Sequence, residues 1–370
     1  MSALLESALL PTYPPTRVTF VEGNGVTLTD DAGRTYLDFS SGIAVVGLGH
    51  RHPAPLAAAH AQLDRLWHAS NLYGTEPAVV LAQKLSDRFG GAQAFFCNSG
   101  AEANEAAIKY ARKATGKPGV IALEQSFHGR TLGALAVTGQ PAKRGAFVTP
   151  GARFATPNDV ESLHAVAADD VGLILMEPIL GEGGVIPLTP EFLTAAAQLA
   201  AELGALLALD EVQTGVGRTG TFFAFEQLGV RPQLVTLAKG LANGLPIGAL
   251  LVADEAAGAF VPGDHGSTFG GNPVACAAAG AVVDTIDDTL LENVRANGER
   301  LRAGLQGLGR VRGTGLLIGV ECDGPAQPLV DAALDAGLVC LTSGPNVLRL
   351  APPLVVTAED VDRALQVLTR

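Results

Sequence analysis

The chain has few cysteines and no dense basic stretch, and each shortage excludes a class of protein. The 370 residues include four cysteines, Cys97, Cys276, Cys322 and Cys340, and none of them forms a C-x-x-C pair. This pattern supports neither a disulfide framework nor a metal site, so we expect buried free thiols in a reducing compartment. Acidic residues outnumber basic ones, 37 to 25, for a net charge of −12. Without a lysine or arginine cluster, no nucleic-acid partner is expected.

Long hydrophobic runs are also missing. The longest, such as VGLILM and GALLAL, have the length of a strand, so no membrane span is expected. The N-terminal stretch MSALLESALLPTYPPT carries an acidic residue and no basic region, unlike a signal peptide. The composition, 48% hydrophobic and 17% charged with 45 glycines, is that of a core-rich globular protein of one large or two smaller domains. We expect a cytoplasmic protein that acts on small metabolites.

The middle of the chain repeats one pattern, in which a short apolar run leads through a polar or glycine-rich turn into a helical stretch. The runs are 94–97, 120–123, 171–176, 205–209 and 234–238. This alternation predicts an α/β fold with a mostly parallel sheet and helices on both faces. Ligands of such sheets bind at the carboxyl ends of the strands. Polar residues stand at those ends: Asn98, Glu124, Glu177, Asp210 and Lys239.

The two ends of the chain differ from the middle. Residues 17–45 show hairpin-like strands, with turns at 23–25 and 30–33. From about 286 the pattern predicts a helix over 290–308, a strand over 315–321 and a final helix from Ala358. We therefore expect a large domain over 46–262 and a smaller α+β domain over 263–370, which the N-terminal segment 1–45 joins.

The stretch NSGAEANEAAIKYAR, residues 98–112, predicts a helix that begins after a turn of small residues. Glu102 and Glu105 fall in its first turns, which suits the helix dipole. The free N–H groups at such a helix start can bind an anion, although an ordinary capped helix would give the same sequence.

Other candidates follow neighbouring strands. Asp210 ends a run that would otherwise be buried, and a buried carboxylate needs a partner, for example backbone N–H groups, an arginine or a protonated ring nitrogen. Phe127 could stack on a flat ring, and Arg130 could hold a carboxylate. The nearby stretch 215–220 matches the dinucleotide pattern G-x-G-x-x-G, but at most two helical turns follow it before Pro232, so nicotinamide binding is a remote alternative.

Lys239 ends the apolar run 234–238, where a lysine often only extends its charge to water. Combined with an anion site, an aromatic ring and a buried aspartate at the same sheet edge, it supplies the parts that pyridoxal 5′-phosphate requires. The phosphate needs N–H donors, the ring nitrogen a carboxylate, and the aldehyde a lysine for a Schiff base.

At this point the sequence resembles the class III aminotransferases, which are pyridoxal phosphate enzymes of fold type I. The resemblance covers nearly the whole chain. It rests on YLDFSSGIAVVGLGHRHP, NSGAEANEAAIKYAR, FHGRTLGALAVTG, MEPILGEGGVIP, LDEVQTGVGRTG, LAKGLANGLPIGA, HGSTFGGNP and VLRLAPPL. The stretches LWHASNLY and FHGRT are most similar to the acetylornithine aminotransferases.

The resemblance implies roles for matching residues. Lys239 would be the Schiff-base lysine and proton shuttle, and Asp210 would pair with the ring nitrogen. The cofactor set would comprise Gly100, Ala101, Phe127, Asp210, Glu211, Val212, Gln213, Lys239 and Thr268. The substrate set would comprise Arg130, Ser267, Glu182 and Arg349. Ser267 and Thr268 would reach in from the second subunit of a homodimer, which would make 263–273 a dimer contact. No metal ligand is expected.

The resemblance also implies substrates. These would be N2-acetylornithine, whose terminal amine reacts, together with 2-oxoglutarate and its product glutamate, within arginine biosynthesis. Glu182 would mask Arg349 while the amine donor is bound and release it for the keto acid, although a static salt bridge remains the alternative. Ornithine, succinylornithine, 4-aminobutyrate and carrier-linked lysine are alternative amine donors, because the enzymes that use them share the cofactor motifs.

Overall fold

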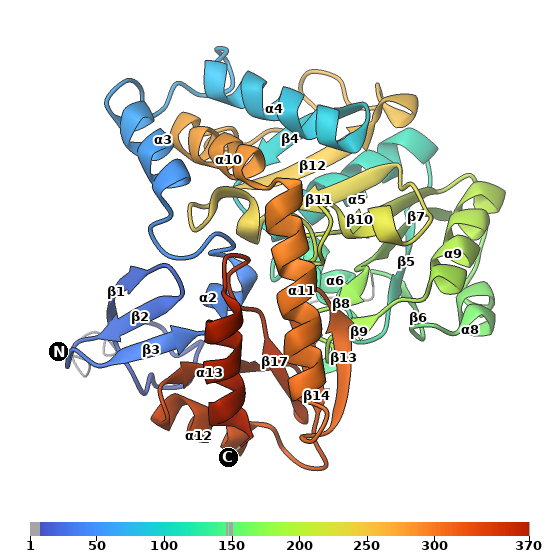
Figure 1. Ribbon diagram of the computed structural model, residues 1–370. Helices are drawn as coiled ribbons and strands as arrows, with labels where there is room; N and C mark the ends of the chain where they lie inside the picture. The colour runs from blue at the N-terminus through green and yellow to red at the C-terminus, as the bar shows by residue number, and fades with distance from the viewer. Residues whose placement is uncertain (1–7, 146, 148–150, 370) are drawn as a thin grey trace.

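The computed structural model describes residues 8–145, 147 and 151–369, and its centre is a seven-stranded sheet (Figure 1). The strand order is β4-β12-β11-β10-β7-β5-β6. Only β12 is antiparallel to its neighbours, β11 and β4, so the expectation of a mostly parallel sheet in an α/β fold is confirmed. The strands are β4 (Ala92–Cys97), β5 (Gly119–Leu123), β6 (Arg153–Ala155), β7 (Val171–Met176), β10 (Leu206–Asp210), β11 (Leu234–Leu237) and β12 (Gly248–Ala253).

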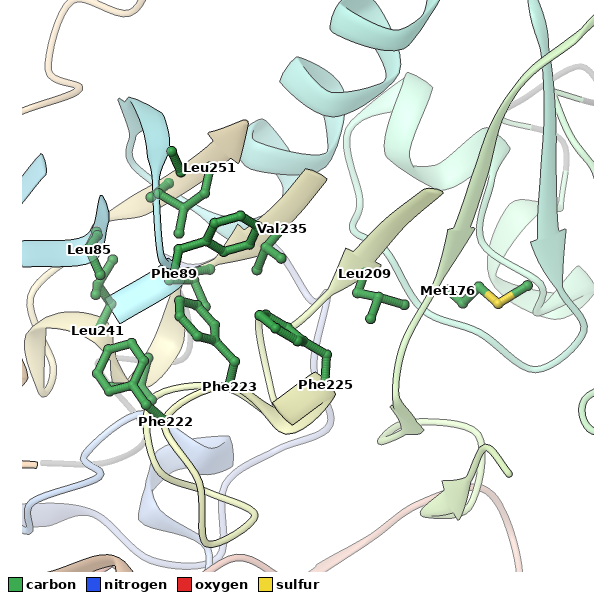
Figure 2. Close-up of a cluster of buried hydrophobic side chains, with 14 of the residues drawn as sticks. Leu85, Phe89, Met176, Leu209, Phe222, Phe223, Phe225, Val235, Leu241 and Leu251 are labelled. Atoms are coloured by element: carbon green, nitrogen blue, oxygen red, sulfur yellow. The ribbon is translucent and has the colours of Figure 1, made fainter. Parts of the chain in front are cut away.

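Helices cover both faces of this sheet because successive residues of each strand point to opposite sides. On one face, the buried alanines of α5 (Gly100–Thr115) pack on Leu173, Ala208 and Leu250. The other face packs against α4 (Glu76–Phe89), α9 (Pro190–Leu203) and α10 (Pro273–Thr285). Figure 2 shows part of this second core, where Phe89 of α4 meets Phe223, Phe225 and Val235.

Shorter elements connect and extend the large sheet. They are α2 (Ser41–Ala44), α3 (Pro53–Leu63), α6 (Leu132–Ala136), α7 (Pro141–Arg144), α8 (Val160–Ala165), a two-stranded ribbon of β8 (Ile179–Leu180) and β9 (Ile186–Pro187), and the 3₁₀ turns η1 (Ala224–Gln227), η2 (Lys239–Ala242) and η3 (Asp254–Ala256).

The two ends of the chain form neighbouring sheets. The N-terminal strands β1 (Phe20–Asn24), β2 (Thr27–Asp30) and β3 (Thr35–Asp38) make a meander, and β3 pairs in parallel with β15 (Leu338–Val339). The second sheet has the order β13-β14-β17-β16. Its elements and helices are β13 (Arg310–Thr314), β14 (Leu317–Glu321), β16 (Leu341–Thr342), β17 (Val347–Leu350), α11 (Asp288–Gly304), α12 (Gln327–Asp335) and α13 (Ala358–Leu368).

Leu37 and Phe39 of the N-terminal segment share one core with residues of α11, β14 and α13. Residues of α10, by contrast, belong to the core of the large sheet, and α10 packs against α3 and α4. We therefore propose that the small unit begins near Asp288, at the start of α11, rather than at residue 263. No helix among the described residues is both long and apolar enough to span a membrane.

Candidate active site

The carboxyl ends of the central strands open on one cavity of about 480 Å³. Lys239 follows β11, Asp210 ends β10, and Glu177 follows β7, so parallel strands deliver their polar end residues to a common edge. The cavity wall contains nine of the residues expected from the sequence: Gly100, Ala101, Phe127, Arg130, Glu182, Asp210, Val212, Gln213 and Lys239.

Lys239 has the electrostatics of a reactive amine. Its Nζ has no hydrogen-bond or ion-pair partner among the described residues. Burial lowers its pKa to about 8; the charge of Glu182 opposes this shift, and that of Arg349 adds to it. The backbone at Lys239 has φ +40°, an unfavourable region for a residue with a side chain. Such backbone strain persists only where the surrounding structure fixes it, and it concentrates at functional sites.

Asp210 is held by a buried hydrogen-bond network. Its Oδ1 accepts from the backbone N–H of Val212 at 3.0 Å, and its Oδ2 accepts from Asn104 Nδ2 and His128 Nδ1, each at 2.7 Å. Asn104 is also fixed from its other end, where its Oδ1 accepts from Thr236 Oγ1 of β11 at 2.8 Å. The carboxylate is 3% exposed, so these donors replace the water it has lost.

The sequence analysis missed Asn104 and His128 as functional residues. Both line the cavity, and Nε2 of His128 is buried without a hydrogen-bond partner. Asn104 lies on the inner face of α5, at a position where the periodic pattern otherwise places alanines. A polar residue on such a face was the available signal for Asn104. For His128, which lies on a loop, the sequence offered only its place beside Phe127.

The start of α5 presents free donors to the same cavity. Ser99 caps the helix by accepting from Glu102 N–H, while the N–H groups of Gly100 and Ala101 have no partner among the described residues. Two glycines keep this helix end open to a ligand. A Cβ on Gly100 would lie 2.7 Å from Val212, and one on Gly129 would lie 2.6 Å from the Cβ of Ala101. The predicted anion site therefore has unpaired N–H donors and a backbone that only glycine permits.

Glu182 and Arg349 form an ion pair beside the cavity. Arg349 is 4% exposed, and its Nη1 also donates to the carbonyl of Gly181 at 3.0 Å and to Gln213 Oε1 at 3.3 Å. Burial alone would raise the pKa of Glu182, but the charge and hydrogen bond of Arg349 outweigh it and hold the pKa below its usual value. The pair expected from the sequence is thus formed, with Glu182 rather than Arg349 in the cavity wall.

Phe127 is fixed by the loop that follows β5. Its N–H donates to Glu177 Oε1 at 2.8 Å, and Glu177 Oε2 accepts from Gly181 N–H at 3.0 Å. Burial raises the pKa of Glu177, and the neighbouring His128 opposes this rise. Arg130 is exposed, with its Cζ 5.6 Å from the centre of the Phe127 ring. The loop therefore brings an aromatic face and a cation to the cavity together.

An N-terminal turn completes the wall through Val45. Four successive residues before it, 41–44, have positive φ angles between 49° and 67°, and three of the four are not glycine. Asp38, fully buried, holds the turn by accepting from Ser40 N–H, Ser40 Oγ and Ser41 N–H at 2.8–2.9 Å. Nothing in the residue pattern predicted a left-handed turn there.

The structure does not bring every predicted residue to the cavity. The carboxyl group of Glu211 accepts from the N–H groups of Ala224 and Phe225 instead, and burial raises its pKa to about 8. Its side chain therefore stabilises the start of η1. Ser267 Oγ accepts from Asn98 Nδ2 at 3.1 Å without lining the cavity, and Thr268 is exposed. The G-x-G-x-x-G stretch 215–220 leads only into η1 and lines no part of the cavity.

The chain is similar to known proteins over nearly its whole length. The family "Aminotransferase class-III" matches residues 10–370. The acetylornithine aminotransferase of Mycolicibacterium smegmatis is 47% identical, over 96% of this chain and 94% of that protein. The N-acetylornithine aminotransferase of Stenotrophomonas maltophilia has a solved structure with a TM-score of 0.87, 36% identity, and coverage of 100% and 97%. The ornithine aminotransferase of Toxoplasma gondii has a TM-score of 0.94, 31% identity, and coverage of 99% and 92%.

The lowered pKa of Lys239 gives a direct test of this site. An amine reacts in its neutral form, so Lys239 in the ligand-free protein should reach half-maximal labelling by acetic anhydride near pH 8, against about pH 10.4 for an ordinary lysine. Pulse labelling over a pH series, read by peptide mass spectrometry, measures this midpoint. Lys84, which pairs with Asp284 elsewhere, is the internal control. Equal midpoints for the two lysines would contradict the electrostatic account.

Proposed function

The chain belongs to the class III aminotransferase family, and from this premise we propose that it is an acetylornithine aminotransferase. It would transfer the terminal amino group of N2-acetylornithine to 2-oxoglutarate, giving N-acetylglutamate 5-semialdehyde and glutamate. The observation that carries the proposal is one cavity that combines an unpaired lysine of lowered pKa, a buried aspartate and a free helix N-terminus. The full-length similarity to acetylornithine aminotransferases supports the substrate.

The residues of the cavity fit pyridoxal 5′-phosphate, the cofactor of this family. The open N–H groups of Gly100 and Ala101 suit a phosphate, the buried Asp210 suits a protonated ring nitrogen, and Lys239 is free to bond to a carbonyl carbon. When bound, the cofactor withdraws electrons from the carbon that carries the reacting amine, so that a proton can leave that carbon.

The protein's own groups would then hold the cofactor and move the proton. Lys239 Nζ, which is neutral in a fraction of the molecules near physiological pH because burial lowers its pKa to about 8, would take up the proton and return it. Asp210 would present its carboxyl group to the ring nitrogen, because Asn104 and His128 fix its position. Phe127 would cover the ring, and Gln213 would donate through its amide nitrogen to a ring oxygen. We expect no cofactor contact from the side chain of Glu211.

The ion pair of Glu182 and Arg349 would allow one cavity to accept two different substrates. Acetylornithine must present its terminal amine, and a free Arg349 would instead attract its α-carboxylate to the reacting position. With Glu182 in place the arginine charge is neutralised, and rotation of Glu182 away would free Arg349 for the α-carboxylate of 2-oxoglutarate. Arg130 would hold the carboxylate at the other end of each substrate.

We further propose that the active enzyme is a homodimer of the cytoplasm that serves arginine biosynthesis. An apolar patch formed by Leu66, Trp67, Leu72, Tyr73, Leu245 and Phe269 is exposed in the single chain. Asn71 Nδ2 ties its two segments together by donating to the carbonyls of Ser267 and Gly270. Leu245 also lines the cavity, so the patch adjoins the site. A second copy that covers the patch would bring its own exposed Thr268 towards the cofactor phosphate.

The alternative amine donors are ornithine, succinylornithine, 4-aminobutyrate and carrier-linked lysine, and one assay ranks them. We expect the purified protein to absorb in the visible range through its bound cofactor. That band should be lost on addition of N-acetylornithine and return with 2-oxoglutarate.

With 2-oxoglutarate as acceptor, acetylornithine should give a kcat/KM at least about 10-fold above each alternative, as expected of a pocket that contacts the acyl group. Lys239→Ala should abolish turnover. A colourless protein that does not respond to added pyridoxal phosphate would contradict the proposal, and a higher rate with another donor would correct the substrate.

The Glu182→Ala variant tests the role of the ion pair. Removing the carboxylate leaves Arg349 without its ion-pair partner at all times. The kcat/KM for amine donors that react at an α-amine should therefore rise. We expect the kcat/KM for glutamate relative to that for acetylornithine to rise about 10-fold, in the range of one charged hydrogen bond. Glu182→Gln, which keeps the shape without the charge, should fall between the two. An unchanged preference in both variants would make the pair a static salt bridge.

The Phe269→Glu variant tests the dimer. A charge in the centre of the apolar patch should convert the protein to a monomer in sedimentation velocity and lower the transaminase rate at least about 10-fold, because the site would lack its second wall. Val160→Glu, at a partly exposed apolar residue of α8, is the matched control and should stay dimeric. A wild-type protein that sediments as a monomer while fully active would refute the proposal.

A further inference from the structure

Lysine is rare in this chain, and its six side chains fall into two groups. Four are paired: Lys84 with Asp284, Lys113 with Asp264, Lys109 with the carbonyl of Asp264, and Lys117 with the carbonyl of Leu203. The other two, Lys143 and Lys239, have no hydrogen-bond or ion-pair partner among the described residues. Both lie at the candidate active site, and the function proposed above uses only Lys239.

Lys143, in the short helix α7, lies against the cavity wall. Its Nζ is 4.6 Å from the centre of the Phe127 ring, and the guanidinium of Arg130 lies over the same ring at 5.6 Å. Phe127 and Arg130 both line the cavity. Two cations therefore share one aromatic ring at the edge of the space where the substrate would bind.

The position of Lys143 is unfavourable for a cation without a ligand. The ammonium is half-buried, which lowers its pKa. The charge of Glu182 opposes this shift, whereas those of Arg130 and Arg349 add to it. These neighbouring charges all belong to groups at the cavity. The contact with Phe127 replaces only part of the lost hydration, because a cation over an aromatic ring contributes less than a charged hydrogen bond. A carboxylate ligand would supply what is missing.

We propose that Lys143 is a specificity-determining residue that binds, together with Arg130, the substrate carboxylate remote from the reacting carbon. This inference rests on the proposed function, which requires two substrates of that shape. In 2-oxoglutarate the remote group is the distal carboxylate. In an acylated ornithine that reacts at its terminal amine, it is the α-carboxylate. With Arg349 neutralised by Glu182 while the amine donor is bound, Lys143 and Arg130 are available to hold that carboxylate.

Glutarate is the probe, because it has both carboxylates of 2-oxoglutarate and no carbonyl to react. Calorimetric titration of the cofactor-loaded protein should give a Kd for glutarate about 10-fold or more weaker in Lys143→Met than in wild type, the loss expected of one charged hydrogen bond. Lys143→Arg should stay within about 3-fold of wild type, because it keeps the charge. Lys84→Met, at a lysine paired with Asp284 away from the cavity, should match wild type.

Kinetics separate carboxylate binding from a structural role of the lysine. Lys143→Met should raise the KM for 2-oxoglutarate and for acetylornithine while kcat changes less than about 2-fold. The kcat/KM for pyruvate, which has no remote carboxylate, should not change. An unaltered glutarate affinity in Lys143→Met would overturn the inference. So would an equal loss with 2-oxoglutarate and pyruvate, because that pattern indicates a displaced Phe127. If acetylornithine proves a poor donor but glutarate binding still depends on Lys143, the proposed substrate fails and the inference stands.

Discussion

The buried carboxylate of Asp210 is the constraint around which the cavity is built. Two of its partners come from distant parts of the sequence, Asn104 in α5 and His128 in the loop after β5, and the third is the backbone N–H of the nearby Val212. Asn104 continues the network to Thr236 on β11. Removing one side chain of this network would leave a buried polar group unpaired, which costs about 1–3 kcal/mol of folding free energy. The network therefore fixes the strand, helix and loop that carry the proposed cofactor residues relative to one another.

Charged groups of both signs surround the cavity. Glu177 and Glu182 lie among Arg130, Arg349, Lys143 and Lys239, and these neighbouring charges oppose or add to the effect of burial on the pKa of each carboxyl group and each lysine. Burial lowers the pKa of both unpaired lysines, whereas Glu182 is kept ionised by Arg349. A protein that must bind a dianionic keto acid and then an amine donor benefits from a cation whose charge can be neutralised for one substrate and exposed for the other. Glu182 is placed to mask Arg349, and no acidic side chain of the residues that the structure describes pairs with Lys143.

Both ends of the chain also reach the cavity. Arg349 lies on β17 beside the cavity, where it pairs with Glu182 of the wall. Val45 lines the wall itself and follows a turn anchored by Asp38 at the end of β3. These two segments belong to opposite ends of the chain, yet β3 pairs with β15 and both ends share one core. The unit formed by the chain ends therefore adjoins the cavity through Val45, and Figure 1 shows its elements α2, β3 and β17 beside the large sheet.

The sequence alone determined five of the seven strands of the large sheet and the order of the motifs, and it predicted nine of the residues that line the cavity. Apolar runs such as 171–176 have the length and composition of buried strands, and parallel strands bring residues such as Asp210 and Lys239 to one edge. Tertiary structure decided what depends on contacts between distant segments: His128 and Asn104 on Asp210, the carboxyl group of Glu211 on η1, and Lys143 over Phe127. No local pattern encodes these contacts, because each depends on which side chains meet once the sheet and its helices are packed. The sequence therefore identified the groups that can react, and packing decided which of them are paired and which are left for a ligand.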